Sequence, residues 1–415
     1  MYLKKFLCYT FAMAFRIQWD DVPEKADADN FASLYSMEKD SENSVNQADS
    51  SSSAEKEKHI FIEGDNYPAL KFLQKDYSGK IDFIYIDPPY NTGKTNFTYN
   101  DSFNVDSWLS FMNRRLQIAK DLLSERGCIF IAIGQEELYR LKLLCDQIFG
   151  EENFINDFMW LHGKGKKDSF SRTMQQSNIC YAKNRKKLKA FSDYEITDWA
   201  KNNLDDDERG NWFSGSISFS EERSNSEHPN FYEIISPSGV KWNRQWLIKK
   251  AEMENLLAQN KIYWGQSPEY NNVPRRKIFN GEKTEIIPKN IIDGAESTRS
   301  AQNHVDALLG EKNSFDNPKP VNLIQHLIQI TGMPDNITVL DFFAGSGTTF
   351  EAVIRQNQQD NGKRRCIIIQ KPEKIEKSPL YKNIAHLCFT RIKKIIPPQD
   401  GIEYYRCTEN SKKLN

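Results

Sequence analysis

The sequence lacks an excess of charge of either sign and lacks paired cysteines. Its 56 basic and 57 acidic residues leave a net charge of −1, so the overall charge does not indicate a nucleic-acid-binding protein, although a local basic patch could. The seven cysteines form no C-x-x-C pair and have no histidine partners at zinc spacing. We therefore expect reduced thiols in a cytoplasmic protein and no metal site.

The sequence also lacks a long apolar run. The opening stretch MYLKKFLCYTFAMAF has two lysines followed by about ten apolar residues, which is similar to the start of a signal peptide. No convincing cleavage site follows, and the stretch is too short to span a bilayer. We therefore expect no secretion and no membrane association.

What is present is an alternation of strand and helix patterns, interrupted once. Strand-like apolar runs alternate with amphipathic helical segments over residues 59–152, and the alternation returns over residues 317–400. This order predicts the α/β class, with a doubly wound, mostly parallel sheet. The other predicted segments are a lead-in and polar linker (1–58), an inserted region of short strands and repeated aromatics (153–316) and a tail (401–415).

The first unusual stretch is DFIYIDPPYNTG, residues 82–93, in which a buried strand runs into two prolines. Adjacent prolines stop the strand and stiffen the turn at its carboxyl end, where open α/β sheets bind ligands. An aromatic ring beside acceptors suits a flat base with an exocyclic amine. Tyr90 would stack on the base, and the Asp87 carboxylate and Pro88 carbonyl would accept the two amine hydrogens. The alternative is a proline-rich turn with a capping acid.

The second unusual stretch is VLDFFAGSGTTFEAV, residues 339–353, in which a strand meets a Gly-x-Gly loop and a helix start. The glycines let the backbone approach a ligand, and the helix start offers free N–H groups. The loop lacks the lysine of a phosphate-binding P-loop, so it suits a less phosphorylated nucleotide such as S-adenosylmethionine. The alternative is a tight turn that needs small residues.

Together, IDPPYNTG and LDFFAGSGTT resemble the amino-methyltransferases that modify adenine N6 or cytosine N4 in DNA, in the permuted order of the β class. FIEGDNYPALKFL, WLSFMNRRLQIAKDLL and FDNPKPVNLI further resemble the Mod subunit of type III restriction–modification systems. The resemblance implies a Rossmann-like methyltransferase fold, S-adenosylmethionine as cofactor and double-stranded DNA as substrate. It also implies a restriction (nuclease/helicase) subunit as partner, and a homodimer.

The resemblance assigns roles to particular positions. The catalytic residues would be Asp87, Pro88, Pro89 and Tyr90. The cofactor-binding residues would be Asp65, Lys319, Pro320, Asp341, Phe342, Phe343, Ala344, Gly345, Ser346, Gly347, Thr348, Thr349 and Gln370. The sequence departs from the family at AIGQEE, where Gly134 and Gln135 replace two acids.

Contacts with DNA are expected from the inserted region, where basic residues gather locally. The candidates are Lys164, Lys166, Lys167, Arg172, Arg275 and Arg276. The leading interpretation is a DNA adenine-N6 methyltransferase that flips its target base out of the duplex. Three alternatives stay open: a cytosine-N4 methyltransferase, a catalytically silent DNA-binding relic, and a protein or RNA methyltransferase.

Overall fold

The structure is a computed structural model that describes residues 16–45, 58–93, 101–167, 170–266, 269–376 and 378–410, with the backbone alone for 163–167. The chain divides into two compact units. The first unit comprises residues 1–191 and 289–415, and the second comprises residues 192–288. Residues 153–191 and 289–316 of the expected insertion therefore belong to the first unit.

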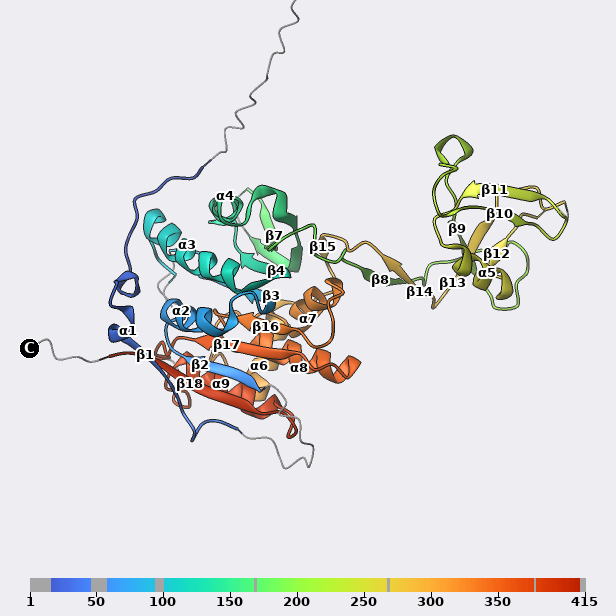
Figure 1. Cartoon of the computed structure of the whole chain (residues 1–415). Helices are drawn as coiled ribbons and strands as arrows, with labels where there is room; N and C mark the ends of the chain where they lie inside the picture. The colour runs from blue at the N-terminus through green and yellow to red at the C-terminus, as the bar shows by residue number, and fades with distance from the viewer. Residues whose placement is uncertain are drawn as a thin grey trace, which may run out of the picture. The chain divides into compact units, whose positions relative to one another are not determined.

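Among the described residues, the first unit has one sheet of eleven strands (Figure 1). From one edge, the strands are β1 (Tyr35–Lys39), β18 (Ile402–Glu409), β2 (His59–Glu63), β17 (Arg365–Gln370), β16 (Thr338–Asp341), β3 (Ile81–Ile86), β4 (Leu123–Ile133), β7 (Arg172–Ala182), β6 (Met159–Lys167) and β15 (Ile291–Ile292). β5 (Phe154–Asp157) pairs with β7. The strands from β18 to β4 run parallel, whereas β1 and β7 are antiparallel to their neighbours.

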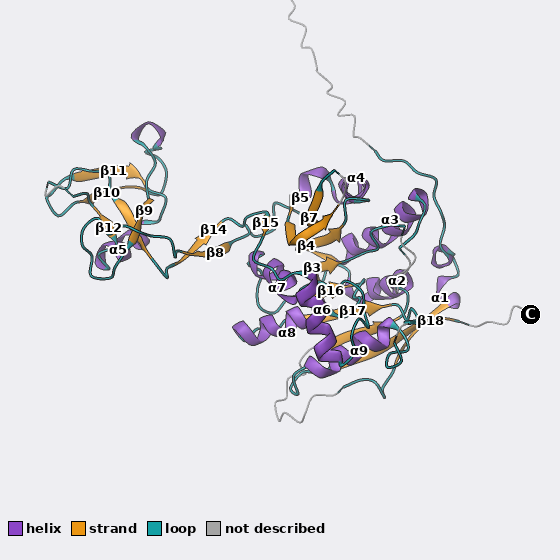
Figure 2. Ribbon diagram, turned by 180° about the vertical axis from the view of Figure 1, so that it is seen from behind, coloured by secondary structure: helices purple, strands orange, loops and turns teal. Residues whose placement is uncertain are grey.

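Helices cover both faces of this sheet (Figure 2). One apolar core joins the sheet to α2 (Asn66–Tyr77), α3 (Val105–Leu122) and α4 (Leu138–Phe149). A second core joins the other face to α7 (Val321–Ile330), α8 (Thr348–Asp360) and α9 (Ile384–Ile395). α6 (Thr298–Leu309) packs against α9. Strands buried on both faces read as continuous apolar runs, as IDFIYI does. The predicted α/β fold with a doubly wound, mostly parallel sheet is confirmed.

Two segments expected outside the fold contribute to this sheet. Part of the predicted linker forms η1 (Lys25–Asp27), α1 (Phe31–Leu34) and the edge strand β1. The predicted tail contains β18, which lies between β1 and β2. In β18, Ile402 and Tyr404 alternate into the core, and the Tyr404 ring lies 5.0 Å from that of Phe61. This period-two alternation is what places an otherwise polar segment in a sheet.

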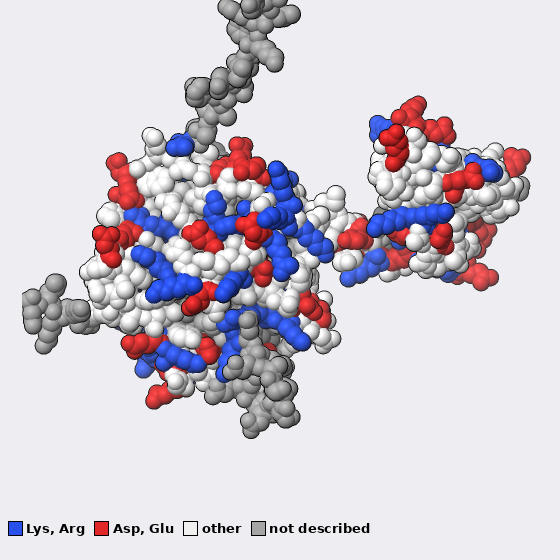
Figure 3. All heavy atoms as spheres, in the orientation of Figure 1, with Lys and Arg blue, Asp and Glu red and all other residues white. Residues whose placement is uncertain are grey.

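The second unit has its own small core. A two-stranded ribbon, β8 (Asp193–Ile196) with β14 (Lys283–Ile286), holds its two ends together. Its other elements are β9 (Trp212–Ser216), β10 (Phe231–Ile235), β11 (Lys241–Gln245), α5 (Lys250–Ala258), β12 (Ile262–Tyr263) and β13 (Arg275–Phe279). It also has a short 3-10 helix at Glu221–Arg223, and the first unit has one at Glu151–Asn153. Trp246 and Met253 lie at the centre of its core. Acidic and basic side chains are interspersed on the visible face of each unit (Figure 3).

The described helices include none that is long and apolar enough to cross a membrane.

His59, at the start of β2, gives the fold a predicted pH dependence. Its Nδ1 accepts a hydrogen bond from the Cys366 backbone N–H at 3.0 Å, and burial, with the Arg365 charge, lowers the pKa of His59 to about 4. The unfolded chain binds a proton near pH 6.5 that the native state does not, so stability should fall as pH drops from about 6.5 towards 4. Measured by urea unfolding, the free energy of unfolding should fall by about 2 kcal/mol between pH 7.5 and pH 5 because of this group. His59→Gln should flatten the profile by that amount; an unchanged slope would contradict the assignment.

Candidate functional site

The two unusual sequence stretches meet at one edge of the sheet. β3 and β16 are neighbouring parallel strands, with Phe83 paired to Val339 and Ile84 to Leu340. The proline turn follows β3 and the glycine loop, residues 342–347, follows β16. Because the carboxyl ends of parallel strands share an edge, motifs about 250 residues apart in sequence become adjacent.

Asp87 has one carboxylate oxygen paired and one unpaired. Its Oδ2 lies 2.5 Å from Nζ of Lys319, a mostly buried side chain that precedes α7. That ammonium also lies 5.1 Å from the centroid of the Tyr90 ring. Asp87 Oδ1 is buried and finds no hydrogen-bond partner among the described residues. A buried acceptor of this kind is costly unless a ligand supplies a donor, so the site suits an amine placed between Asp87 and Tyr90.

Residues that sequence reasoning missed hold the proline turn. The buried Trp108 of α3 donates from Nε1 to the Pro89 carbonyl at 2.9 Å. Asn91 has a positive φ of 57°, and its Nδ2 donates to Oε1 of the buried Glu137 at 2.8 Å. Asp101 accepts the Asn91 backbone N–H at 2.8 Å. The turn is therefore fixed from three directions.

Gly134, where the sequence departs from the family pattern, lies close to the Tyr90 ring. A Cβ at this position would lie 2.9 Å from Cδ2 of Tyr90 and 2.4 Å from a carboxylate oxygen of Glu136. The Tyr90 ring thus lies against the backbone at the position where the resemblance led us to expect an acid. Glu137, the last residue of AIGQEE, supplies a buried carboxylate to the same region.

Asp341 braces the glycine loop from within. Its Oδ1 accepts the Phe343 backbone N–H at 2.9 Å, and its Oδ2 accepts the Thr349 hydroxyl. Burial, with a further contribution from the nearby Asp87 charge, raises the pKa of Asp341 to about 7. Both carboxylate oxygens are engaged with the loop and the start of α8, so this side chain shapes the turn that we predicted as the cofactor site.

Gln370 and Asp65 also contact the loop or its supports. The Gln370 side-chain oxygen accepts the Gly345 backbone N–H at 2.7 Å. Asp65 caps α2 by accepting the Tyr67 N–H at 3.0 Å and pairs with Lys371 at 3.0 Å. Burial would raise the pKa of Asp65, but the charges of Arg115 and Lys371 outweigh it and hold that pKa below its usual value.

A buried arginine that the sequence did not single out supports the other side of the loop. Arg391 of α9 donates to the Ser346 hydroxyl at 2.8 Å and to the Ser346 carbonyl at 3.2 Å. It also pairs through Nε and Nη2 with one oxygen of Glu351, at 2.9 and 2.7 Å. Burial would raise the pKa of Glu351, but the hydrogen bond from His304 and the charge of Arg391 bring it down to about 2. The Glu351 carboxyl is therefore ionised at neutral pH.

The remaining predicted cofactor residues lie around this loop. Phe342 and Ala344 are buried residues of the loop itself, and Thr348 accepts a hydrogen bond from Arg391 at 3.2 Å. Gly347 has a φ of 85°, and a Cβ there would lie 3.0 Å from Sγ of Cys388, so a larger residue would not fit. Pro320 precedes α7 as its N-cap.

The predicted DNA contacts are distributed over both units. Lys164, Lys166 and Lys167 lie on β6, where the structure describes the backbone alone, and Arg172 is exposed at the start of β7. In the second unit, Arg275 donates to the Ser214 hydroxyl at 2.6 Å, and Arg276 lies 3.5 Å from Glu282. Their role in DNA binding stays a prediction. Within the described ranges, no cluster of three or more His, Cys, Asp or Glu side chains could hold a metal ion.

Residues 81–382 match the model of the DNA methylase family (N6_N4_Mtase), and the chain belongs to that family. It is also similar to the type III restriction–modification enzyme StyLTI Mod subunit of Salmonella typhimurium, with 31% identity over 79% of this chain and 54% of that protein. The EcoPI Mod subunit of Escherichia phage P1 is 32% identical over 81% of this chain and 62% of that protein. The type II methyltransferase M.KpnI of Klebsiella pneumoniae is 28% identical over 87% of this chain and 91% of that protein.

These matches confirm the resemblance to DNA amino-methyltransferases and to Mod subunits. The chain spans between half and two thirds of the length of those two Mod subunits.

Lys319 was predicted to bind the cofactor, but its ammonium contacts Asp87. We therefore expect Lys319→Met to lower kcat for methyl transfer about tenfold, because Asp87 loses the partner that orients it, and to leave S-adenosylmethionine binding within about threefold. Lys312→Met, an exposed lysine before the same block, is the matched control. Calorimetric Kd values beside steady-state kinetics check this. A loss of cofactor affinity with unchanged kcat would contradict this role and would favour the predicted role of Lys319 in cofactor binding.

Proposed function

We propose that the chain is a site-specific DNA methyltransferase that transfers a methyl group from S-adenosylmethionine to adenine N6 in duplex DNA. One observation carries the proposal: the Asp87–Tyr90 turn, whose buried Asp87 Oδ1 has no hydrogen-bond partner among the described residues, lies beside the glycine loop at one sheet edge. Membership of the DNA methylase family and the Mod-like relatives support it. Adenine is preferred over cytosine because the Mod relatives match most of this chain, and the resemblance to Mod subunits favours adenine N6 as the target.

In this proposal the chain's residues work by orientation. Asp87 and the Pro88 carbonyl accept the amine hydrogens, and Tyr90 stacks on the flipped base, so the nitrogen lone pair points towards the cofactor. S-adenosylmethionine, when bound, supplies an electrophilic methyl group on a sulfonium and leaves as the neutral thioether. With the cofactor bound, the nitrogen would form the new bond to the methyl carbon as the carbon–sulfur bond breaks, and Asp87 or water would accept the proton that the amine loses. No protein nucleophile is needed.

The glycine loop would hold the cofactor. Its turn requires glycine at two positions, because Gly345 has a φ of 53° and Gly347 a φ of 85°. Asp341, Gln370 and Arg391 fix the loop from three sides. A loop fixed in this way can bind a ligand without first being ordered, which favours affinity.

Further parts of the proposal concern partners. We propose that the basic candidates on β6, β7 and β13 contact DNA, and that the region within residues 153–316 selects the sequence. Because its relatives include Mod subunits, we also propose a restriction subunit as a partner. We further propose that the protein is a homodimer and is located in the cytoplasm.

Methyl transfer to different acceptors tests the function. Purified protein with tritium-labelled S-adenosylmethionine should label unmethylated duplex DNA, and should leave RNA and protein unlabelled. Label in RNA or protein instead, or no label in any acceptor, would contradict the proposal. The second outcome, together with DNA binding, would favour the catalytically silent relic.

A further inference from the structure

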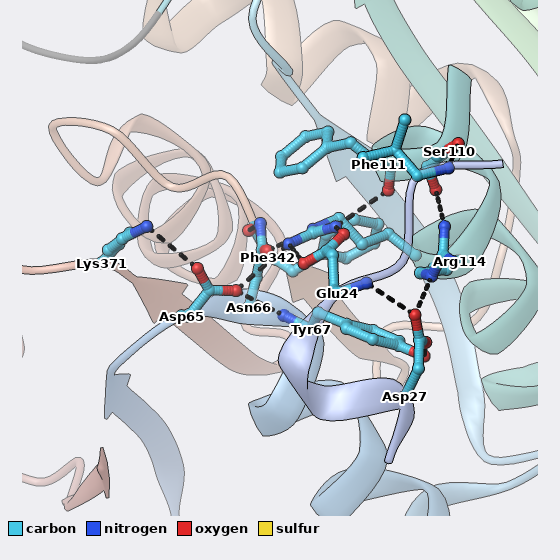
Figure 4. A network of polar contacts seen from close by, with 12 residues as sticks. Glu24, Asp27, Asp65, Asn66, Tyr67, Ser110, Phe111, Arg114, Phe342 and Lys371 are labelled. Atoms are coloured by element: carbon cyan, nitrogen blue, oxygen red, sulfur yellow. Dashed lines mark hydrogen bonds and ion pairs between the residues drawn. The ribbon is translucent and has the colours of Figure 1, made fainter. Parts of the chain in front are cut away.

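Residues 16–27, which we call the N-terminal strap, lie across α2 and α3 close to the glycine loop (Figure 4). The Trp19 indole N–H donates to the Ser110 hydroxyl at 3.0 Å, and the Val22 backbone N–H donates to the same oxygen at 2.9 Å. Asp21 pairs with Arg114 at 2.8 Å. The strap is thus attached to α3 by specific polar contacts, although its composition predicted a linker.

The centre of this attachment is Arg115, whose side chain is 1% exposed. All five of its N–H groups have acceptors. Nη1 and Nη2 donate to the two oxygens of Glu24 at 2.5 and 3.0 Å, and Nε donates to Oδ1 of Asn66 at 2.5 Å. The remaining two donate to the Phe111 carbonyl at 2.9 Å and to Asp65 at 3.2 Å. The guanidinium therefore has one arrangement that satisfies every donor.

The first route from Arg115 to the glycine loop passes through Asn66. Because Asn66 Oδ1 accepts from Arg115, its amide nitrogen is turned the other way. That nitrogen donates to the Phe342 carbonyl at 2.7 Å, and Phe342 is the first residue of the loop. Figure 4 shows Asn66, Phe342 and Glu24 of the strap close together in this network. The orientation of one amide thus transmits the position of Arg115 to the loop backbone.

The second route passes through Asp65, which receives Arg115 on Oδ1 and Lys371 on Oδ2. Lys371 follows Gln370, and Gln370 accepts the Gly345 N–H. Asp65 is also the acid that the resemblance places near the adenine moiety of the cofactor. Both routes therefore end at residues of the proposed cofactor site.

We propose that Glu24 and Arg115 are positioning residues for the cofactor, so that the N-terminal strap is a working part of the S-adenosylmethionine site. The inference rests on the proposed function for the identity of the ligand. Glu24 is the bidentate partner of the guanidinium. Without that carboxylate, two N–H groups of a buried cation lose their charged acceptor. Arg115 then turns towards Asp65, its Nε leaves Asn66, and the Phe342 carbonyl loses a fixed donor.

The test measures S-adenosylmethionine binding by calorimetry for the full chain carrying Glu24→Gln. We expect Kd to rise at least tenfold, the KM for S-adenosylmethionine to rise by a similar factor, and kcat at saturating cofactor to stay within about twofold. The matched control is Asp21→Asn, the same carboxylate-to-amide change in the same strap at the neighbouring Arg114, which should leave Kd within about twofold. A strap with a merely structural role would lower the melting temperature in both variants and leave Kd unchanged.

A second variant keeps the inference falsifiable if Glu24→Gln folds poorly. Asn66→Ser removes the amide that joins Arg115 to Phe342 and should also weaken cofactor binding, through the first route alone. The double variant should bind no more weakly than Glu24→Gln alone, because the contact that Asn66→Ser removes already depends on the position of Arg115. Wild-type affinity in Glu24→Gln, or additive losses in the double variant, would overturn the inference alone. A wild-type protein that binds no S-adenosylmethionine would overturn the proposed function as well.

Discussion

Asp87→Ala should lower methyl transfer by about 10³-fold or more while leaving S-adenosylmethionine binding within about twofold. The carboxylate follows β3, pairs with Lys319 and has its other oxygen without a partner among the described residues, whereas the glycine loop is braced by Asp341, Gln370 and Arg391. Loss of Asp87 therefore removes the amine acceptor without loosening the loop. Single-turnover transfer to DNA and calorimetric cofactor binding, measured on the same preparation, check both parts.

Two further variants sharpen this result. Asp87→Asn keeps the size of the side chain but replaces an acceptor oxygen by a donor, so it should be nearly as inactive as alanine. Asp76→Ala, at an exposed aspartate of α2, should transfer at the wild-type rate. Near wild-type transfer by Asp87→Ala would show that the proline turn is not the active site.

Arg391→Met should cost about 3 kcal/mol or more of folding free energy and weaken cofactor binding. The change leaves Glu351 buried without its bidentate partner and removes the donor to both the Ser346 carbonyl and hydroxyl. Urea unfolding at pH 7 measures the loss. We expect cofactor saturation to restore little of it, since the glycine loop that binds the cofactor is itself displaced.

The matched control for this prediction is Arg355→Met. Arg355 contacts the same carboxylate from the other side, but its side chain is 42% exposed and it makes no contact with the glycine loop among the interactions described above. Its loss should therefore cost less than about 1 kcal/mol. Equal losses in the two variants would show that Arg391 acts as an ordinary ion-pair partner and not as a support of the loop.

The sequence predicted the central sheet and its two motifs because their signals are local. IDFIYI is apolar at nearly every position, as a strand covered on both faces must be, and the prolines after it mark its end. The glycine loop is similarly visible, since only small residues allow its turn. Knowing that parallel strands share one carboxyl edge then suffices to bring Asp87 and the loop together.

The supports of the site were not predictable in the same way, because each depends on a partner distant in sequence. Within IAHLCFTRIKKI, Arg391 looks like one of three surface cations, yet it is fully buried against a loop about 45 residues away. Glu24 lies in a polar stretch whose composition favours a linker, and its partner Arg115 is one of two adjacent arginines on a long helix. Lys319 pairs with Asp87 across more than 200 residues. Composition and periodicity carry no information about such pairs.

The most direct test of the central claim is the identity of the methylated base. Unmethylated duplex DNA is incubated with the protein and S-adenosylmethionine carrying a heavy-isotope methyl group, digested to nucleosides and analysed by mass spectrometry. The account predicts labelled N6-methyladenine, and none from the Asp87→Ala variant. Labelled N4-methylcytosine in its place, or no labelled nucleoside, would contradict it.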